Sequence, residues 1–334
     1  MNHFLLSLTA ILILLLSALF AVPYFVDWND YRHVFEAQAT KLLGRDVKVG
    51  GEVHLVLLPA PRLRFDDVKV ADADGNLDRP FLEAKRLEAG LNIGALLSGT
   101  IEARKIGITA PVLRLELNAD GTGNWADVGR PGEAMPFVPK EVLLDQIDVT
   151  GGTVELTRAG APVATLTDVS GDASAASLSG PYKVAATYKF EGRKQDLKFS
   201  TGASDAHGKF HLKSALRDPD RDTVYLLDGD VIGLGEKPSY DGSIIVKNAV
   251  AAPAEPTPTP PVAEPGETTD TGSGFELKGD LTATADRAEL PSFELTLHAK
   301  GRPQLMKGKL AIEFGETRKF DGELSARFLD VDAL

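Results

Sequence analysis

The chain has 334 residues, of which 36 are lysine or arginine and 48 are aspartate or glutamate, so its formal net charge is −12. Such an acidic protein repels phosphate backbones, and no basic stripe interleaved with aromatic residues is present, which argues against nucleic acid as a partner. The chain contains no cysteine, so disulfides, thiolate metal sites and cysteine nucleophiles are excluded together.

The N-terminus predicts a transmembrane anchor over residues 1–27. No charged residue occurs from Phe4 to Val26, and at about 1.5 Å per residue this run crosses a hydrocarbon core of about 30 Å. A cleaved signal peptide is the alternative. It is disfavoured because the apolar run is longer than a signal peptide needs and no Lys or Arg precedes it. The N-terminal stub before Phe4 is short, so we expect it to stay in the cytoplasm while the long body lies outside.

An amphipathic helix is predicted next, over residues 28–44. Its apolar residues recur at helical spacing: Trp28, Tyr31, Val34, Phe35, Ala39, Leu42 and Leu43. Asp27 or Asn29 is suited to cap its start and Gly44 its end. We expect this helix to lie at the membrane surface and also to plug the end of a sheet, with Trp28, Tyr31 and Phe35 at the membrane interface.

From residue 45 onward the period of the apolar residues changes to two, which is typical of strands with one polar and one apolar face. The pattern predicts β regions over 45–129, 141–250 and 275–334, and the last of these reads as a further, incomplete β repeat. Only one more helical turn, near Ile93 to Leu97, is predicted. Because few helices can cover the apolar faces, the sheet must pack on a second sheet, curl on itself or leave an apolar groove.

Breaks in the pattern predict the connections. Residues 130–140 read as a loop, and residues 251–274, rich in Pro, Ala and Thr, read as a disordered linker. Turns of antiparallel hairpins are predicted at Asp120-Gly121, Gly151-Gly152, Asp228-Gly229 and Asp321-Gly322. A weak repeat relates Gly229–Gly242 to Gly308–Gly322 and suggests an array that grows by adding hairpins.

The sequence contains no motif that predicts catalysis. His207 and His211 fall on one side of a strand but lack the helical H-E-x-x-H context of a zinc enzyme. Asp72, Asp74, Asn76 and Asp78 resemble a calcium loop, but Leu77 stands where such a loop needs glycine and no helices flank it. We therefore expect neither an enzyme nor a metal site nor a cofactor.

Several segments resemble the N-terminal region of AsmA-family proteins, and the resemblance extends over residues 1–128. They are Trp28-Asn29-Asp30-Tyr31-Arg32, Leu42-Leu43-Gly44-Arg45, the strand from Val53 to Leu58, Pro61-Arg62-Leu63, Leu96-Leu97-Ser98-Gly99, the stretch from Ile106 to Leu117, and the turn Asp120-Gly121-Thr122-Gly123-Asn124-Trp125.

This resemblance implies a bacterial inner-membrane protein, crossing the membrane once, with a periplasmic body that supports outer-membrane biogenesis. It also implies a long twisted antiparallel sheet curled into an apolar groove that binds phospholipid and passes it between membranes. The expected partners are membrane lipids, the inner membrane and other envelope proteins. The groove candidates are Val53, Leu55, Leu57, Leu113, Leu115, Leu117, Tyr182, Val184 and Tyr188. A non-enzymatic scaffold that influences outer-membrane protein assembly or targeting remains the alternative, because a groove lining and a closed core have the same alternation.

Overall fold

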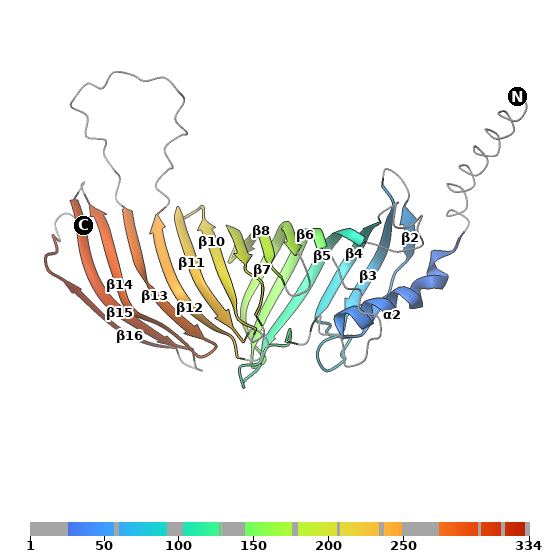
Figure 1. Ribbon diagram of the computed structural model, residues 1–334, viewed down its shortest axis with the longest axis horizontal. Coiled ribbons are helices and arrows are strands. Elements are labelled where there is room, and N and C mark those ends of the chain that lie inside the picture. The colour runs from blue at the N-terminus through green and yellow to red at the C-terminus, as the bar shows by residue number, and fades with distance from the viewer. Residues whose placement is uncertain are drawn as a thin grey trace, which may run out of the picture.

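The computed structural model describes residues 26–56, 60–91, 103–126, 128, 144–175, 180–205, 208–233, 237–248, 274–299, 302–314 and 318–330. These residues form one 16-stranded sheet with a short helical segment at its N-terminal end. The strands lie side by side along the long axis of the molecule, from α2 at one end to β16 at the other (Figure 1). The expected mainly β architecture, with a long twisted sheet, is confirmed.

The helical segment consists of η1 (Trp28–Tyr31) and α2 (Arg32–Leu43). The strands are β1 (Val47–Val49), β2 (Val53–Val56), β3 (Arg62–Val70), β4 (Leu82–Leu91), β5 (Ala103–Leu117), β6 (Leu144–Arg158), β7 (Ala161–Ala175), β8 (Tyr182–Phe190), β9 (Arg193–Thr201), β10 (Phe210–Asp218), β11 (Thr223–Ile232), β12 (Ser239–Asn248), β13 (Gly274–Thr284), β14 (Arg287–Ala299), β15 (Arg302–Glu313) and β16 (Lys319–Ala326).

From β3 onward, each strand pairs with the next one in the chain, while β1 and β2 both pair with β3. All pairs are antiparallel except β5 and β6, which run parallel. A parallel pair needs a crossover connection rather than a hairpin, and the chain between Leu117 and Leu144 supplies one. The expected antiparallel pairing is therefore confirmed for every described strand pair except this one. Most of the connection, including the loop predicted at 130–140, lies outside the described residues.

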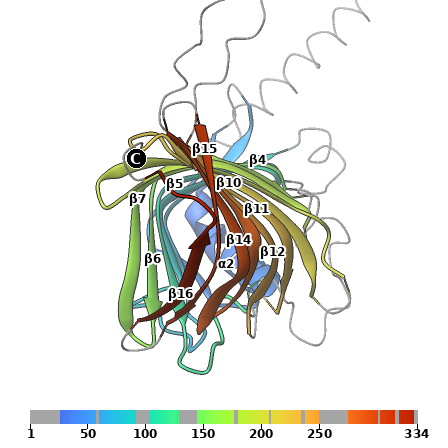
Figure 2. The same ribbon diagram turned by 90° about the vertical axis from the view of Figure 1, so that its left-hand side faces the viewer.

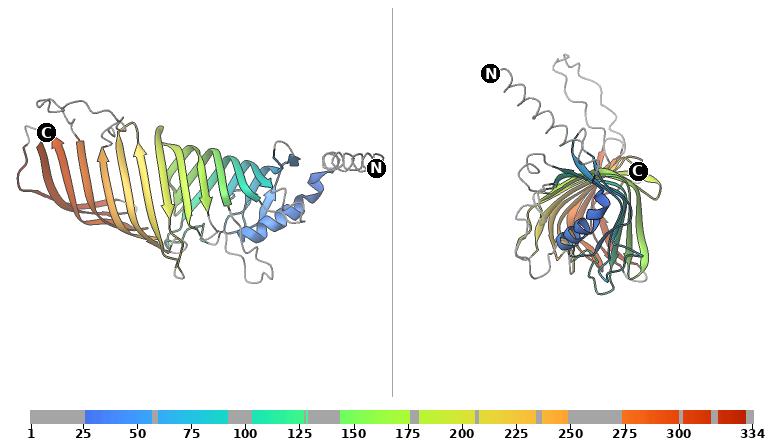
Figure 3. Two further views of the ribbon diagram at one scale, coloured as in Figure 1. Left: turned by 45° about the horizontal axis from the view of Figure 1, so that its top comes forward. Right: turned by 90° about the vertical axis from the view of Figure 1, so that its right-hand side faces the viewer.

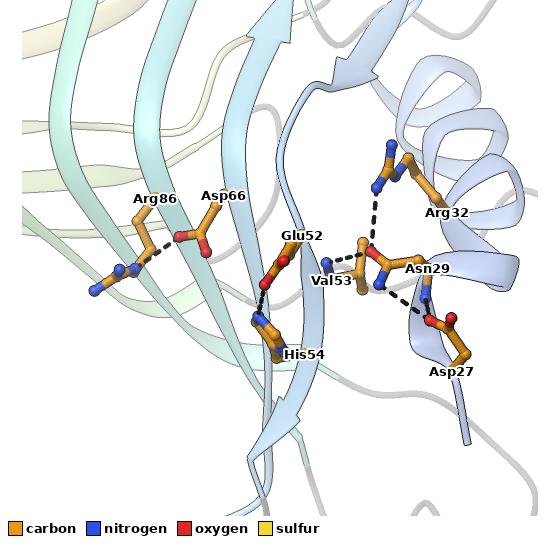
Figure 4. A network of polar contacts seen from close by, with 8 residues as sticks. All are labelled: Asp27, Asn29, Arg32, Glu52, Val53, His54, Asp66 and Arg86. Atoms are coloured by element: carbon orange, nitrogen blue, oxygen red, sulfur yellow. Dashed lines mark hydrogen bonds and ion pairs between the residues drawn. The ribbon is translucent and has the colours of Figure 1, made fainter. Parts of the chain in front are cut away.

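Local hydrogen bonds explain where the helical segment begins and ends. The side chain of Asp27 accepts a hydrogen bond from the backbone N–H of Asn29 and caps η1, and Gly44, with φ of 71°, ends α2 in the left-handed region. The amide oxygen of Asn29 accepts from the backbone N–H of Val53 at 3.0 Å and from Arg32 at 3.1 Å, which ties η1 to β2 (Figure 4). Both predicted caps are confirmed.

Seen along its long axis, the sheet is curved and α2 lies within the curve (Figures 2 and 3). The side chains that contact the helix therefore identify the concave face. Trp28, Phe35, Ala39 and Leu43 pack against a core that includes Val53 and the following buried residues of β1 and β3: Val47, Val49, Leu63, Phe65, Val68 and Val70. This helix plugs one end of the curved sheet, as expected.

The hydrophobic core is confined to that end. Among the described residues, every buried hydrophobic side chain except those of Ala175, Val231 and Met306 lies between Val47 and Ala84. The strands that follow carry apolar side chains at the same alternation, and no helix in the described part of the chain packs on them. Their apolar side chains are mostly half-buried.

The sheet twists so strongly that its two opposite rims, which are formed by the ends of the strands, come into contact. Arg158, at the end of β6, forms an ion pair with Asp286, in the turn between β13 and β14. The turn at Gly121, which follows β5, approaches Lys237 and Ala285. The lower ends of the early and late strands converge accordingly at the bottom of Figure 1.

Three of the predicted glycine turns were wrong. Gly151-Gly152, Asp228-Gly229 and Asp321-Gly322 lie within β6, β11 and β16. Gly229 pairs with Gly242, and a Cβ on either residue would meet the opposite backbone within about 2.6 Å. Here glycine allows close approach within the sheet rather than a reversal of the chain. The predicted turn at Asp120-Gly121 is confirmed.

The repeat between Gly229–Gly242 and Gly308–Gly322 corresponds to two hairpins of the sheet. The first copy connects β11 to β12 and the second connects β15 to β16. The sheet therefore grows by hairpins in this half of the chain, as the repeat suggests.

Three further predictions fall outside the described residues. They are the anchor from Phe4 to Val26, apart from Val26 itself, the helical turn near Ile93 to Leu97, and the linker 251–274, apart from Gly274, which begins β13. Within the described part of the chain, no helix is both long enough and apolar enough to cross a membrane.

Candidate functional site

The concave face carries rows of mostly apolar residues that run across the strands. Residues paired in register share a face, because side chains alternate along each strand. One row begins at Phe65, beneath the helix, and continues through every following strand to β16: Leu87, Ile108, Val149, Gly171, Ala186, Leu197, Leu216, Tyr225, Val246, Leu277, Leu295, Met306 and Ala326. With about 4.8 Å between strands, this row extends for about 60 Å.

A second apolar row runs beside the first. It begins at Leu63, and Ser214 is its one polar member: Ala89, Ile106, Ile147, Ala173, Val184, Phe199, Ser214, Leu227, Ile244, Gly279, Phe293, Gly308 and Leu324. Together the two rows, called here the inner rows, form a continuous apolar strip from the plugged end to the last strand.

The convex face has the opposite character. The row that begins at Arg64 lies between the two inner rows along each strand, with its side chains on the other face, and most of its members are charged. Its further members are Glu88, Gly107, Asp148, Asp172, Ala185, Lys198, Ala215, Leu226, Ile245, Lys278, Glu294, Lys307 and Ser325. Cross-strand ion pairs such as Arg86–Asp66 at 2.9 Å (Figure 4) lie on this face. Exposed pairs of this kind add little stability, so their main effect is to keep the convex face hydrated.

The predicted strand of leucines lies on the concave face. Leu113 pairs with Leu82 of β4 and Val154 of β6, and Leu115 pairs with Leu156. Leu113, Leu115 and the neighbouring Leu117 are all half-buried. In a close-packed core such leucines would be fully buried, so this part of the face is open to solvent or to a ligand.

Tyr182, Val184 and Tyr188 also lie on the concave face, further along the sheet. Val184 pairs with Ala173 and Phe199 in an inner row, and the two tyrosines share its face. Burial raises the pKa of the Tyr182 and Tyr188 hydroxyls above the ordinary tyrosine value, because the charged phenolate is poorly solvated there.

The first group of groove candidates needs a correction. Val53 is 1% exposed and belongs to the core beneath the helical segment, and Leu55 packs against that core. Both face the concave side, but at its plugged end, where Val53 is closed to any ligand. Leu57 lies outside the described residues.

The three candidate membrane-interface residues do not point the same way. Trp28 and Phe35 pack against the core, and the Phe35 ring meets Phe65 edge-on with centroids 5.3 Å apart. Tyr31 is 50% exposed. The helical spacing of the apolar residues does not separate those that plug the sheet from those that face outward. Trp28 and Phe35 are therefore corrected from interface residues to half-buried residues that pack against the core.

Two aromatic rings lie across glycines on the concave face. A Cβ on Gly308 would meet the Phe293 ring at 2.7 Å, and a Cβ on Gly242 would meet the Tyr240 hydroxyl at 2.7 Å. The Tyr240 hydroxyl donates to the backbone oxygen of Ser243 at 2.9 Å. Both aromatic side chains therefore occupy the space that a side chain at the glycine would need.

The side chains of the calcium-like loop, residues 72–78, form hydrogen bonds and an ion pair within the protein itself. Asp72 accepts a hydrogen bond from the side chain of Asn124 at 2.9 Å and pairs with Arg45 at 3.7 Å. The backbone N–H of Asn76 donates to Asp74 at 2.8 Å. Among the residues that the structure describes, no three carboxylate or imidazole groups converge as a metal site requires. His207 lies outside those residues, and His211 pairs with Asp228 and Asp230 on the convex face.

One charged feature of the concave face is absent from the sequence-based candidates. Arg158 pairs in register with Leu117 and Ala161, so it stands at the end of the alternation Val154, Leu156, Arg158 on the concave side. In the sequence, Arg158 interrupts an alternation of apolar residues, and this interruption could have identified it as a candidate.

Comparison with protein families finds one match, to the model described as the AsmA family, over residues 2–158. The match covers slightly less than half of the chain and ends with β6. Comparisons with curated proteins and with solved structures gave no significant match.

Proposed function

Because residues 2–158 assign this chain to the AsmA family, we propose that it is a cell-envelope protein whose concave face forms a groove that binds phospholipid and passes it between membranes. Family membership is consistent with a role related to the envelope and the outer membrane.

The single observation that supports lipid binding is the apolar strip made by the inner rows. A soluble protein rarely exposes an apolar surface of this extent unless something apolar binds to it. Acyl chains suit such a strip because they need no hydrogen bonds and can lie along it. The charged convex face supplies the hydrated exterior that a conduit through an aqueous space would need.

The location follows from the same proposal. Residues 1–27 would anchor the chain in the bacterial inner membrane, with the N-terminus in the cytoplasm and the sheet in the periplasm. The plugged end of the sheet follows the anchor directly in the chain, so the strip would begin near the inner membrane. Tyr31, exposed at that end, would be placed at the membrane surface.

A periplasmic scaffold is the second candidate. It is favoured only if the apolar side of the sheet is closed as an ordinary core. Scaffolding needs no continuous apolar path from one end of the sheet to the other, whereas lipid passage does.

A transfer assay tests the proposal. The full chain is reconstituted in donor vesicles that contain a fluorescent phospholipid, and unlabelled acceptor vesicles are added. We expect the label to reach the acceptors faster than with protein-free donors. A rate equal to that of protein-free donors would contradict lipid passage and favour the scaffold.

A further inference from the structure

The place where the opposite rims meet contains a cavity. It has a volume of about 710 Å³ and lies between the far ends of β5, β6 and β7 on one side and Phe314, which follows β15, and Arg318, which precedes β16, on the other. The ion pair between Arg158 and Asp286 spans the same junction. A cavity of this size is in the range that holds a small ligand or a lipid headgroup with the first part of its chains.

The cavity continues the apolar face of the sheet. Leu117 and Leu156, the last leucines of β5 and β6 on the concave side, line it, and Phe314 lines it from the opposite rim. An acyl chain lying along Leu113 and Leu115 would therefore have its end at this cavity.

Two arginines also line the cavity, Arg158 from β6 and Arg318 from the residues before β16. The Arg158 side chain is 29% exposed, and its partner carboxylate, Asp286, is 81% exposed. Among the described residues, no carboxylate lies within ion-pair distance of Arg318. Among the described residues at the cavity, two guanidinium groups stand against one carboxylate, which leaves a net positive charge beside an apolar wall.

This combination is unusual for a chain with a net charge of −12. An anion would be repelled by most of the surface, so the cations at the cavity would determine where an anionic group can settle. Guanidinium groups bind phosphate and carboxylate with two parallel hydrogen bonds, and such bonds are stronger than those between neutral groups.

We propose that this cavity is a headgroup site for an anionic amphiphile, with Arg158 and Arg318 holding the phosphate or carboxylate and Leu117, Leu156 and Phe314 receiving the chain. This inference rests on the proposed lipid-binding function and adds a selectivity to it: anionic lipid is preferred over zwitterionic lipid. Asp286 competes with the headgroup for Arg158.

The test compares the lipids held by the full chain after incubation with vesicles of equal phosphatidylglycerol and phosphatidylcholine content. Bound lipids are identified by mass spectrometry in the wild type and in the Arg158→Gln, Arg318→Gln double variant. We expect the wild type to be enriched in phosphatidylglycerol, and the double variant to lose about fivefold of that enrichment at unchanged total lipid. Asp286→Asn should raise the enrichment, because it frees Arg158.

A matched control removes two cations from the convex face, in the Lys183→Gln, Lys198→Gln variant, and should keep the enrichment. A wild type that holds lipid without preference, or a double variant that keeps the preference, would overturn the headgroup site while leaving lipid binding intact. A wild type that holds no lipid would overturn the proposed function itself. If inorganic phosphate binds the wild type as tightly as phosphatidylglycerol does, and the double variant binds neither, the site is one for free anions and the lipid assignment is wrong.

Discussion

Replacing Val53 by aspartate should unfold the plugged end of the sheet. Val53 is 1% exposed, its backbone N–H is held by Asn29, and it packs within the one continuous core of the described residues. A carboxylate there has no partner and no route to water, so we expect a loss of more than about 4 kcal/mol in the free energy of unfolding. Denaturant unfolding followed by far-ultraviolet circular dichroism measures it.

The matched control is His54→Asp, one residue further along the same strand. His54 is exposed on the convex face, where its ring lies 2.8 Å from Glu52. A new carboxylate there stays hydrated, so the denaturant concentration at the midpoint of unfolding should shift little. Equal losses for the two variants would contradict the assignment of the faces at this end.

The same substitution at Leu115 should have a different effect, because Leu115 lies on the concave face beyond the helix. It is half-buried, whereas Val53 is 1% exposed, so the new carboxylate can reach water. We expect a loss of stability of about 2 kcal/mol or less, together with a loss of at least about half of the bound phospholipid, since a charge in the path of an acyl chain carries a large desolvation cost. Thermal unfolding and lipid content after purification measure the two effects.

Glu116→Leu is the control for Leu115→Asp. Glu116 lies next in the strand on the convex face, so its replacement should leave both stability and lipid content nearly unchanged. A Leu115→Asp protein that unfolds like Val53→Asp would show a closed core at this strand, as the scaffold alternative requires. One that stays folded with its full lipid content would show that lipid does not lie there.

Local features of the fold could be predicted from the sequence. The alternation of Leu113, Leu115 and Leu117 with polar neighbours indicated both a strand and its apolar side. The helical spacing after Asp27, and Gly44 at its end, indicated the helix and both of its caps. These features depend on neighbours within a few residues, which a sequence displays directly.

Features that depend on distant partners could not be predicted. Alternation gives each strand an apolar side but does not say whether anything covers it, so Val53 and Leu115 looked equivalent although only Val53 is under the helix. Glycine is ambiguous in the same way, because Gly229 faces Gly242 across a strand pair instead of reversing the chain. The meeting of Arg158 and Asp286 follows from twist accumulated over many strands.

The most direct test of the central claim asks whether phospholipid lies on the concave face of the protein in cells. A photo-crosslinking phenylalanine derivative replaces Tyr188, on the concave face, or Lys189, its neighbour on the convex face. After irradiation of cells, mass spectrometry of the purified chain identifies any attached lipid. We predict phospholipid adducts at position 188 and none at position 189. Adducts at neither position, or equally at both, would contradict the proposal that the concave face is a lipid-binding groove.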